Sequence, residues 1–190
     1  MKNKSITMVI LILSFFSCSK KEKVETNYLI RDQTVYFQID KDQRKLRGKL
    51  RPIEEADAAT FKVIPSTLDY GSDKTSVFMD FQLIEDADPE SFKLLEKNQF
   101  ATDKDHVYYY GLKMKGADPK TFVIVNDHYS SDANHIFHNH FQIEGADLES
   151  FEILRNDRYA KDKNHFYDGA LQLDPSDTET RSLIESLQRS

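Results

Sequence analysis

The sequence predicts a mainly β fold: a tandem array of about five repeats of roughly 30 residues, each a short three-stranded antiparallel meander, with a C-terminal capping helix. Three observations lead to this prediction. One six-residue phrase recurs at a nearly constant spacing, a second phrase follows it at a fixed offset, and apolar residues keep the same positions in successive repeats. Self-similarity at such a period is typical of architectures in which each unit buries its apolar face against its neighbours.

The first phrase has the pattern Asp-x-x-(His/Ser)-(Val/Ile/Phe)-(Phe/Tyr) and recurs every 29 to 31 residues. Clear copies begin at Asp73, Asp103, Asp132 and Asp162. Asp42 fits as the start of a weak first unit, so the units begin near residues 42, 73, 103, 132 and 162. The segment from Arg31 to Phe37 resembles the phrase better by residue type than the segment at Asp42 does. Both registers therefore remain open for the first unit.

The second phrase ends in phenylalanine and occupies residues 56–61, 87–92, 117–122 and 146–151. It predicts a corner of the chain, because its Asp accepts local N–H groups, its Pro fixes φ, and its Ser or Thr adds a side-chain bond. Its last position is one of five apolar columns and holds Phe61, Phe92, Phe122 and Phe151, with Arg181 breaking the series. We expect Phe92, Phe122 and Phe151 to be buried equivalently, and Phe122→Ala to cost roughly 3–5 kcal/mol.

Short strands are predicted around both phrases. Residues 107–109 and 112–114 are strand-like and flank a tight turn at Tyr110-Gly111, and a third strand follows each corner. Near the C-terminus, the run Ser-Asp-Thr-Glu at 176–179 resembles a capping box. Leu183, Ile184 and Leu187 then fall on one face of a short helix, which we expect to cover the last open repeat.

Two runs carry a resemblance to a known family. The run YAKDKNHFY from Tyr159 to Tyr167, together with GADPKTF at 116–122, closely resembles the DKNYY repeat family of bacterial envelope proteins. The resemblance covers roughly residues 66–173, with a weaker continuation to 40 and 183. It implies an exported repeat protein, and it brings no activity and no catalytic residue to this chain.

The N-terminal residues predict export. Residues 1–17 combine Lys2 and Lys4 with a short apolar stretch, as in a signal peptide, and Cys18 follows as the one cysteine of the chain. This arrangement resembles the lipobox of bacterial lipoproteins, which implies cleavage before Cys18 and acylation of its thiol and amino groups. The alternatives are an unprocessed anchor or a soluble secreted protein. We interpret residues 18–27 as a tether and residues 28–190 as the repeat domain, held at a membrane of the cell envelope on its periplasmic or surface side.

Charge and composition exclude several classes of partner. Removal of Lys2 and Lys4 leaves 24 basic and 32 acidic residues, a net charge of −8. Such a charge argues against nucleic acid, and against anionic lipid as a partner of the folded part. With one cysteine, no disulfide can form within the chain, so its stability must come from packing.

His138 and His140 are the strongest metal candidates in the sequence. On a strand they would point to the same side, as two ligands of a transition metal do. His135 belongs to a repeat column with His106 and His165, so its presence needs no metal. Without a spaced third ligand we expect no metal and no cofactor. Asx-turns explain the Asp-x-(Asp/Asn) runs of the first phrase better than calcium does.

The sequence favours binding over catalysis. It contains no Gly-x-Ser-x-Gly, no glycine-rich phosphate loop and no His-Glu-x-x-His. We therefore predict a non-catalytic module with a protein or glycan partner in the envelope; the alternative is a metal-binding protein or metal-dependent enzyme centred on His138 and His140. Recognition requires positions at which the units differ, and the predicted hairpin tips differ most. The candidate binding surface consists of Phe81, Tyr109, Tyr110, His138 and His140.

Overall fold

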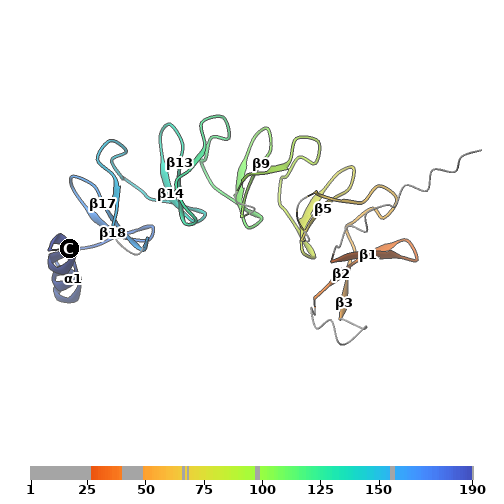
Figure 1. Cartoon of the computed structure of the whole chain (residues 1–190), viewed down its shortest axis with the longest axis horizontal. Helices are drawn as coiled ribbons and strands as arrows, with labels where there is room; N and C mark the ends of the chain where they lie inside the picture. Colours follow the sequence, from red (N-terminus) through yellow and green to blue (C-terminus); the bar gives the residue numbers. More distant parts are fainter. Residues whose placement is uncertain are drawn as a thin grey trace, which may run out of the picture.

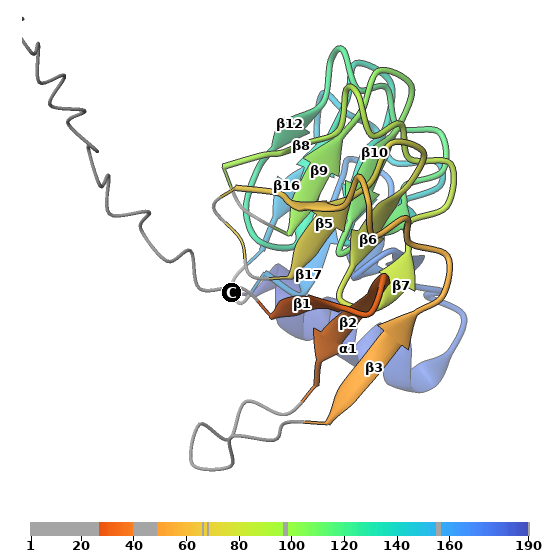
Figure 2. The same cartoon turned by 90° about the vertical axis from the view of Figure 1, so that its right-hand side faces the viewer.

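The computed structural model describes residues 27–39, 49–65, 67, 69–96, 99–154 and 157–189. Over these residues the chain forms five small antiparallel sheets in tandem, followed by one helix, which confirms the predicted fold class. The sheets follow one another along a curved row that ends at the helix (Figure 1). Figure 2 looks along this row with the first sheet in front. Cys18, the signal peptide, most of the tether and the unit start at Asp42 lie outside the described residues.

Each sheet is a meander in which neighbouring strands are antiparallel. The first sheet contains β1 (Tyr28–Arg31), β2 (Thr34–Gln38) and β3 (Leu50–Ile53). The second contains β4 (Lys62–Val63), β5 (Tyr70–Ser72), β6 (Val77–Met79) and β7 (Gln82–Leu83), and the third β8 (Lys93–Leu94), β9 (Phe100–Thr102), β10 (Val107–Tyr109) and β11 (Leu112–Lys113). The fourth contains β12 (Val123–Ile124), β13 (Tyr129–Ser131), β14 (Ile136–His138) and β15 (Phe141–Gln142). The fifth contains β16 (Glu152–Ile153), β17 (Tyr159–Lys161), β18 (Phe166–Asp168) and β19 (Leu171–Gln172).

Four of the sheets have one strand more than the sequence predicts. The additional strand lies just before the Asp of the first phrase and is β5, β9, β13 or β17. Its central residue is small, as in Gly71, Ala101 and Ala160, and therefore gives a weak strand signal. The strand that follows each corner pairs with this additional strand, for example Lys93 with Thr102. Each corner therefore connects two successive sheets.

The first sheet is built from the Arg31–Phe37 segment. Val35 is fully buried between Ile30 and Ile53, as Val77 is in the second sheet. Asp32 and Gln33 form the hairpin turn, with φ of 49° and 61°, the left-handed conformation of a type I′ turn. Asp32 is therefore a turn residue, and this sheet forms from a shorter hairpin than the later units do.

The corner phenylalanines occupy equivalent positions between successive sheets. Phe61, Phe92 and Phe151 each lie between an aromatic ring of the preceding sheet and one of the next, and Phe122 packs on a ring of the preceding sheet. Their ring-centroid distances are Phe61 to Tyr28 5.0 Å and to Phe78 6.1 Å, Phe92 to Tyr70 6.1 Å and to Tyr108 5.7 Å, Phe122 to Phe100 5.7 Å, and Phe151 to Tyr129 6.0 Å and to Tyr167 5.7 Å. The expected equivalence is confirmed, although the four rings are half-buried.

The helix α1 (Thr178–Gln188) begins where a further corner would stand. Its N-cap is Asp177, whose carboxylate accepts the N–H of Thr180 at 2.8 Å, so the capping box predicted from Ser176 is wrong by one residue. In the preceding corner Asp147 accepts the N–H of Ser150 in the same way, at 3.1 Å. The corner is thus a first helical turn that continues into a helix at the end of the array. Leu183, Ile184 and Leu187 are half-buried, and no residue of the helix is buried.

Removal of one corner ring tests this stacking. We predict that Phe122→Ala lowers the free energy of unfolding by about 3 kcal/mol, the lower end of the range for a phenylalanine because the ring is half-buried. Far-UV circular dichroism during urea unfolding measures the change. Val123→Ala, next to it and 57% exposed, is the matched control and should change stability by less than about 0.5 kcal/mol. Equal effects of the two substitutions would contradict the stacking role.

Candidate binding surface

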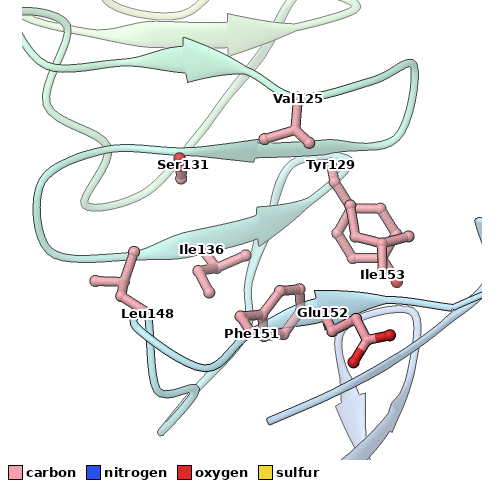
Figure 3. Close-up of a pocket in the computed structure, with 8 residues that line it drawn as sticks. All are labelled: Val125, Tyr129, Ser131, Ile136, Leu148, Phe151, Glu152 and Ile153. Atoms are coloured by element: carbon pink, nitrogen blue, oxygen red, sulfur yellow. The ribbon is translucent and has the colours of Figure 1, made fainter.

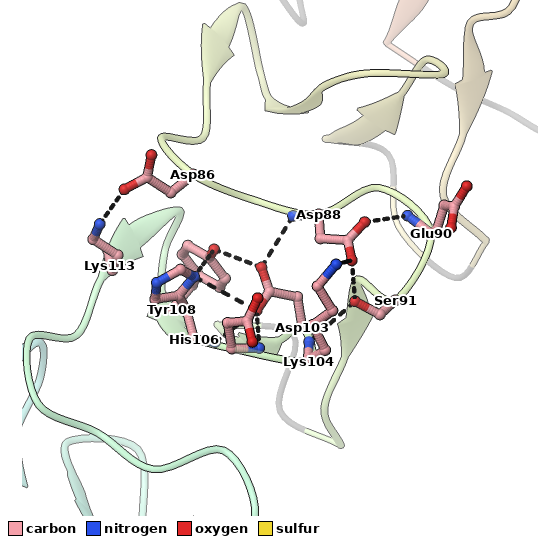
Figure 4. A network of polar contacts seen from close by, with 10 residues as sticks. Asp86, Asp88, Glu90, Ser91, Asp103, Lys104, His106, Tyr108 and Lys113 are labelled. Atoms are coloured by element: carbon pink, nitrogen blue, oxygen red, sulfur yellow. Dashed lines mark hydrogen bonds and ion pairs between the residues drawn. The ribbon is translucent and has the colours of Figure 1, made fainter.

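A buried aspartate organises the loop of each repeat, shown for the third sheet in Figure 4. Asp103 is 5% exposed, and its Oδ1 accepts the N–H groups of Asp105 at 2.8 Å and His106 at 2.6 Å. Its Oδ2 accepts the N–H of Asp88 from the corner at 3.0 Å and the hydroxyl of Tyr108 at 2.8 Å. The same backbone donors surround Asp73, Asp132 and Asp162.

The aspartate of the corner also contacts the loop that carries the buried aspartate (Figure 4). Asp88 accepts the N–H of Glu90 at 3.1 Å and the hydroxyl of Ser91 at 3.0 Å, and its carboxylate pairs with the ammonium of Lys104 at 2.7 Å. The Ser91 hydroxyl oxygen in turn accepts the N–H of Lys104 at 3.0 Å. The two recurring phrases are therefore the two halves of one hydrogen-bonded lock. In the fourth unit Ala133 stands where Lys104 does, so the ion pair is not essential to the lock.

The hydrogen bonds of this lock explain why carboxylates recur in the first phrase, where they resemble metal ligands. Both oxygens of Asp103 face N–H donors, which would oppose a cation at the same position. The residues that the structure describes contain no group of three or more His, Cys, Asp or Glu able to hold a metal ion. The Asp-x-(Asp/Asn) runs are Asx-turns, as expected.

The buried aspartates have depressed pKa values. Burial alone would raise the pKa of Asp162, but donation from the N–H of Asp147, the hydroxyl of Tyr167 and the N–H groups of Asn164 and His165 outweighs burial. The pKa falls from its usual 3.8 to about 2. The unfolded chain therefore binds more protons than the folded chain in this range, and the stability contributed by this carboxylate is lost as the pH falls.

Acid unfolding tests the lock. We predict a free energy of unfolding that varies little above pH 5 and falls as the pH drops from about 4 to 2. Asp162→Asn should lose about 2 kcal/mol at neutral pH and show a shallower acid dependence, because it removes one depressed carboxylate. Chemical unfolding at a series of pH values measures both effects, and Asp157→Asn, on an exposed turn, is the control. Parallel pH profiles of wild type and Asp162→Asn would count against the lock.

The hairpin tips lie at the opposite end of each sheet from the locked loops. Each tip begins with a residue in the left-handed region: Asp80 at φ 55°, Tyr110 at 45°, Asn139 at 55° and Gly169 at 60°. The N–H of each donates to a carbonyl that precedes the neighbouring strand, at distances of 2.6 to 2.8 Å. The tips therefore share one backbone conformation and differ between units in their side chains.

Tyr109 and Tyr110 divide into a packed and an exposed ring. Tyr109 is half-buried and packs against Phe100, with ring centroids 5.0 Å apart. Tyr110 is 51% exposed, meets the ring of Tyr109 edge-on at 4.9 Å, and its hydroxyl donates to Gln99 at 3.3 Å. Tyr110 is therefore oriented by its neighbours while most of its surface remains accessible.

Phe81 joins the first two sheets. The guanidinium carbon of Arg51 lies 3.9 Å from the centre of its ring, and the ring of Phe37 lies 6.3 Å away. Phe81 is half-buried in this arrangement. Phe81, which was predicted to belong to the binding surface, therefore lies at a contact between two units.

His138 and His140 occupy different environments. His138 ends β14, and its ring meets Tyr129 at 4.8 Å and His128 at 5.9 Å. A Cβ at Gly169 of the next unit would lie 3.0 Å from His138 Nδ1, so a side chain there would require the imidazole to shift. Burial and the neighbouring His128 lower the pKa of His138, with Asp168 acting in the opposite direction. His140 lies in the turn itself and packs on Phe141 at 3.8 Å, so the two histidines do not share one strand.

Sequence reasoning missed three exposed apolar residues next to the hairpin tips. Leu112, Phe141 and Leu171 are 52%, 57% and 74% exposed and are the first residues of the last strand in three successive sheets. They pair directly with the end of the preceding strand, as Leu112 does with Tyr109. The signal was an apolar residue at the same offset after each turn. With Tyr110 they form a row that we call the tip strip.

A groove of about 430 Å³ lies between the fourth and fifth sheets (Figure 3). Val125 lines one side, while Leu148, Phe151 and Ile153 from the following corner and strand line the other. Leu148 stands where Pro89 and Pro119 stand in earlier corners. The sequence did not predict this groove, because Phe151 and Ile153 belong to columns that elsewhere form the core, and Val125 and Leu148 belong to no column.

Comparison with known proteins identifies the family. A model described as the DKNYY family matches residues 28–170 and, in a second alignment, residues 136–189. The chain belongs to the DKNYY family. No curated protein and no solved structure matches it significantly. In the DKNYY segment of the last unit, Asp162 holds the corner, Lys163 pairs with Asp147 at 2.7 Å, and the Tyr167 hydroxyl donates to Asp162 at 2.7 Å.

The membrane expectation rests on the N-terminal residues. Within the part of the chain that the structure describes, no helix has the length and apolar character required to cross a membrane. The family match covers residues 28–189, which form the repeat array, and does not include the N-terminal residues.

Proposed function

We propose that this DKNYY protein is a non-catalytic lipoprotein of the cell envelope that acts as a binding module. The tip strip carries the proposal: Tyr110, Leu112, Phe141 and Leu171 are all more than half exposed on a row of sheets whose other faces are packed together. Isolated exposed apolar residues are ordinary, but a row repeated in successive units is typical of an interaction surface. Aromatic and large apolar side chains on a fixed backbone are the residues that dominate binding energy.

A protein partner fits this strip better than a glycan. Leucine side chains offer no hydrogen bond to sugar hydroxyls, whereas aliphatic and aromatic side chains together fit an apolar protein surface. Polar side chains near the strip are partly committed to the array, as Gln99 is through its side-chain N–H to the carbonyl of Asp127 at 2.8 Å. We therefore propose a protein of the envelope as the partner and a glycan as the second candidate.

The locked loops support a non-catalytic role. Acid–base chemistry needs a carboxylate or imidazole that can reach a substrate. The buried carboxylate of Asp103 is surrounded by four donors from its own loop, corner and strand, and His138 is packed between units. These groups stabilise the array, which accounts for them without a reaction.

Membrane attachment through Cys18 would place the array close to a bilayer. Eight residues lie between Cys18 and Asn27, where the described domain begins, and the nine Cα–Cα steps of this stretch span at most about 30 Å. The array would thus stay near the membrane. We propose the periplasmic or surface side of an envelope membrane as its location.

One substitution tests the lipid anchor. We predict that the wild-type chain partitions with membranes and carries acyl chains on an N-terminal Cys18, and that Cys18→Ser abolishes both properties. Fractionation of expressing cells and mass spectrometry of the purified chain measure them. Ser17→Ala, which keeps a small residue before the cysteine, is the control and should remain acylated. Soluble wild-type protein without lipid would disprove the anchor.

Partner capture tests the tip strip. We predict that Tyr110→Ser/Leu112→Ser/Phe141→Ser loses at least about tenfold in affinity for an envelope protein captured by the wild type, since each hot-spot residue contributes more than about 1 kcal/mol. Quantitative pull-down from envelope extract, with stability checked by circular dichroism, measures the loss. Val123→Ser/Val125→Ser is the matched control, because these residues are 57% and 55% exposed near the opposite edge of the fourth sheet. Loss of the partner in the control alone would place binding on that edge.

A further inference from the structure

The inner face of each early sheet is closed by the next sheet. Three core positions on this face are at most 7% exposed in each of the first four sheets. They are Tyr28, Val35 and Ile53, then Tyr70, Val77 and Ile84, then Phe100, Val107 and Met114, then Tyr129, Ile136 and Ile143. This burial is the contact that holds the array together.

The same face of the fifth sheet is incompletely covered. Tyr159, Phe166 and Leu173 occupy the corresponding positions and are half-buried. Leu171 at the edge of this face is 74% exposed, against 52% and 57% for its counterparts Leu112 and Phe141. The helix α1 follows this sheet but has no buried residue, and Arg181 stands at the position that the corner phenylalanine holds in the other units. We call this surface, formed by Tyr159, Phe166, Leu171 and Leu173, the tail face.

The outer face of the first sheet is also apolar. Strand alternation and register place Leu29, Tyr36 and Pro52 opposite one another on the side that faces away from the second sheet. Leu29 is 40% exposed, Pro52 is exposed, and Tyr36 is half-buried. In later sheets the residues at the position of Tyr36 are fully buried by the preceding unit, as Phe78 and Tyr108 are. We call the surface formed by Leu29, Tyr36, Leu50 and Pro52 the head face; its strands β1, β2 and β3 are in front in Figure 2.

The two end faces differ from the inner contacts at two positions. Inside the array a small residue makes room for the corner ring: a Cβ on Gly71 would come within 2.3 Å of the Phe61 ring. At the head face the same position holds the larger Leu29, and after the fifth sheet the sequence has Arg181 at the offset of the corner phenylalanine. A tail face without a corner ring avoids the clash that such a ring would make with Leu29.

Exposed charges of both signs surround each end face. Next to the first sheet they are Arg31, Asp32, Lys49, Glu54 and Glu55, and beside the tail face they are Asp174, Asp177, Glu179 and Arg181. Opposite charges at the rim of a contact favour its formation and fix its orientation.

We propose that copies of this chain assemble head to tail, with the tail face of one copy stacked on the head face of a second. The contact continues the unit-to-unit stacking of the array across two chains. Because two different surfaces meet, the contact is heterologous and propagates into linear chains unless the rotation closes a ring. On tethered molecules it would produce rows of repeats along the membrane.

Complementary variants test this assembly. Leu29→Asp disables the head face and Leu171→Asp disables the tail face, and both residues are exposed, so folding should be preserved. The full chain is purified in mild detergent, and its mass is measured by sedimentation over a concentration series. We expect the wild type to grow beyond a dimer with concentration and each variant to remain a monomer. An equimolar mixture of the two variants should form dimers and stop there, because each dimer has used its only two intact faces. Val123→Asp, exposed on the fourth sheet, should assemble as the wild type does.

Cysteine pairing gives a second measurement. A chain with both Leu29→Cys and Leu171→Cys should give a ladder of disulfide-linked oligomers after mild oxidation, and each single variant should give none beyond the wild-type background from Cys18. A monomeric wild type at all concentrations would overturn the proposal. Dimers from Leu171→Cys alone would overturn it in favour of a tail-to-tail contact, and assembly that both aspartate variants retain would place the contact elsewhere.

Discussion

The buried aspartate of each repeat joins two loops that lie 14 to 16 residues apart in the chain. A carboxylate that is 5% exposed, as Asp103 is, is costly unless its oxygens are fully hydrogen-bonded, and here backbone N–H groups from both loops satisfy them. The strands of the last four sheets have two or three residues and could not hold these loops alone. The lock fixes the corner, the corner fixes its phenylalanine, and the phenylalanine sets the stacking of the sheets.

This dependence explains why the sequence predicted the architecture so well. The lock needs Asp at two fixed positions and Ser or Thr at a third, so the phrases recur with little change. The fourth strand escaped notice because residues such as Gly71 and Ala101 are chosen for lack of bulk beneath a ring, which hides the strand pattern. The N-cap was misplaced by one residue because Ser176 and Asp177 both have capping side chains, and only the alignment of Asp177 with Asp147 decides between them.

The candidate surface was harder to predict. The sequence identified the tips as the place where units differ, and Tyr110 has the exposure that this requires. It could not separate Tyr110 from Phe81 or His138, because their burial depends on Arg51 and on Gly169 in other units. The exposed positions of Leu112 and Phe141 depend on the sheet ending at that strand, which follows from the strand order and not from the repeat pattern.

A repeat array divides its residues between stacking and recognition, and its ends belong to neither class. Inner sheets bury both faces. Each terminal sheet has one face with the same pattern of apolar residues but no adjacent sheet to cover it. Arrays usually resolve this with polar capping units. Here the helix contributes no buried residue, and the first sheet presents Leu29 outward at 40% exposure. The departures from the repeat at Leu29 and Arg181 occur at the two ends of the array, where the stacking of units would have to continue in a second chain.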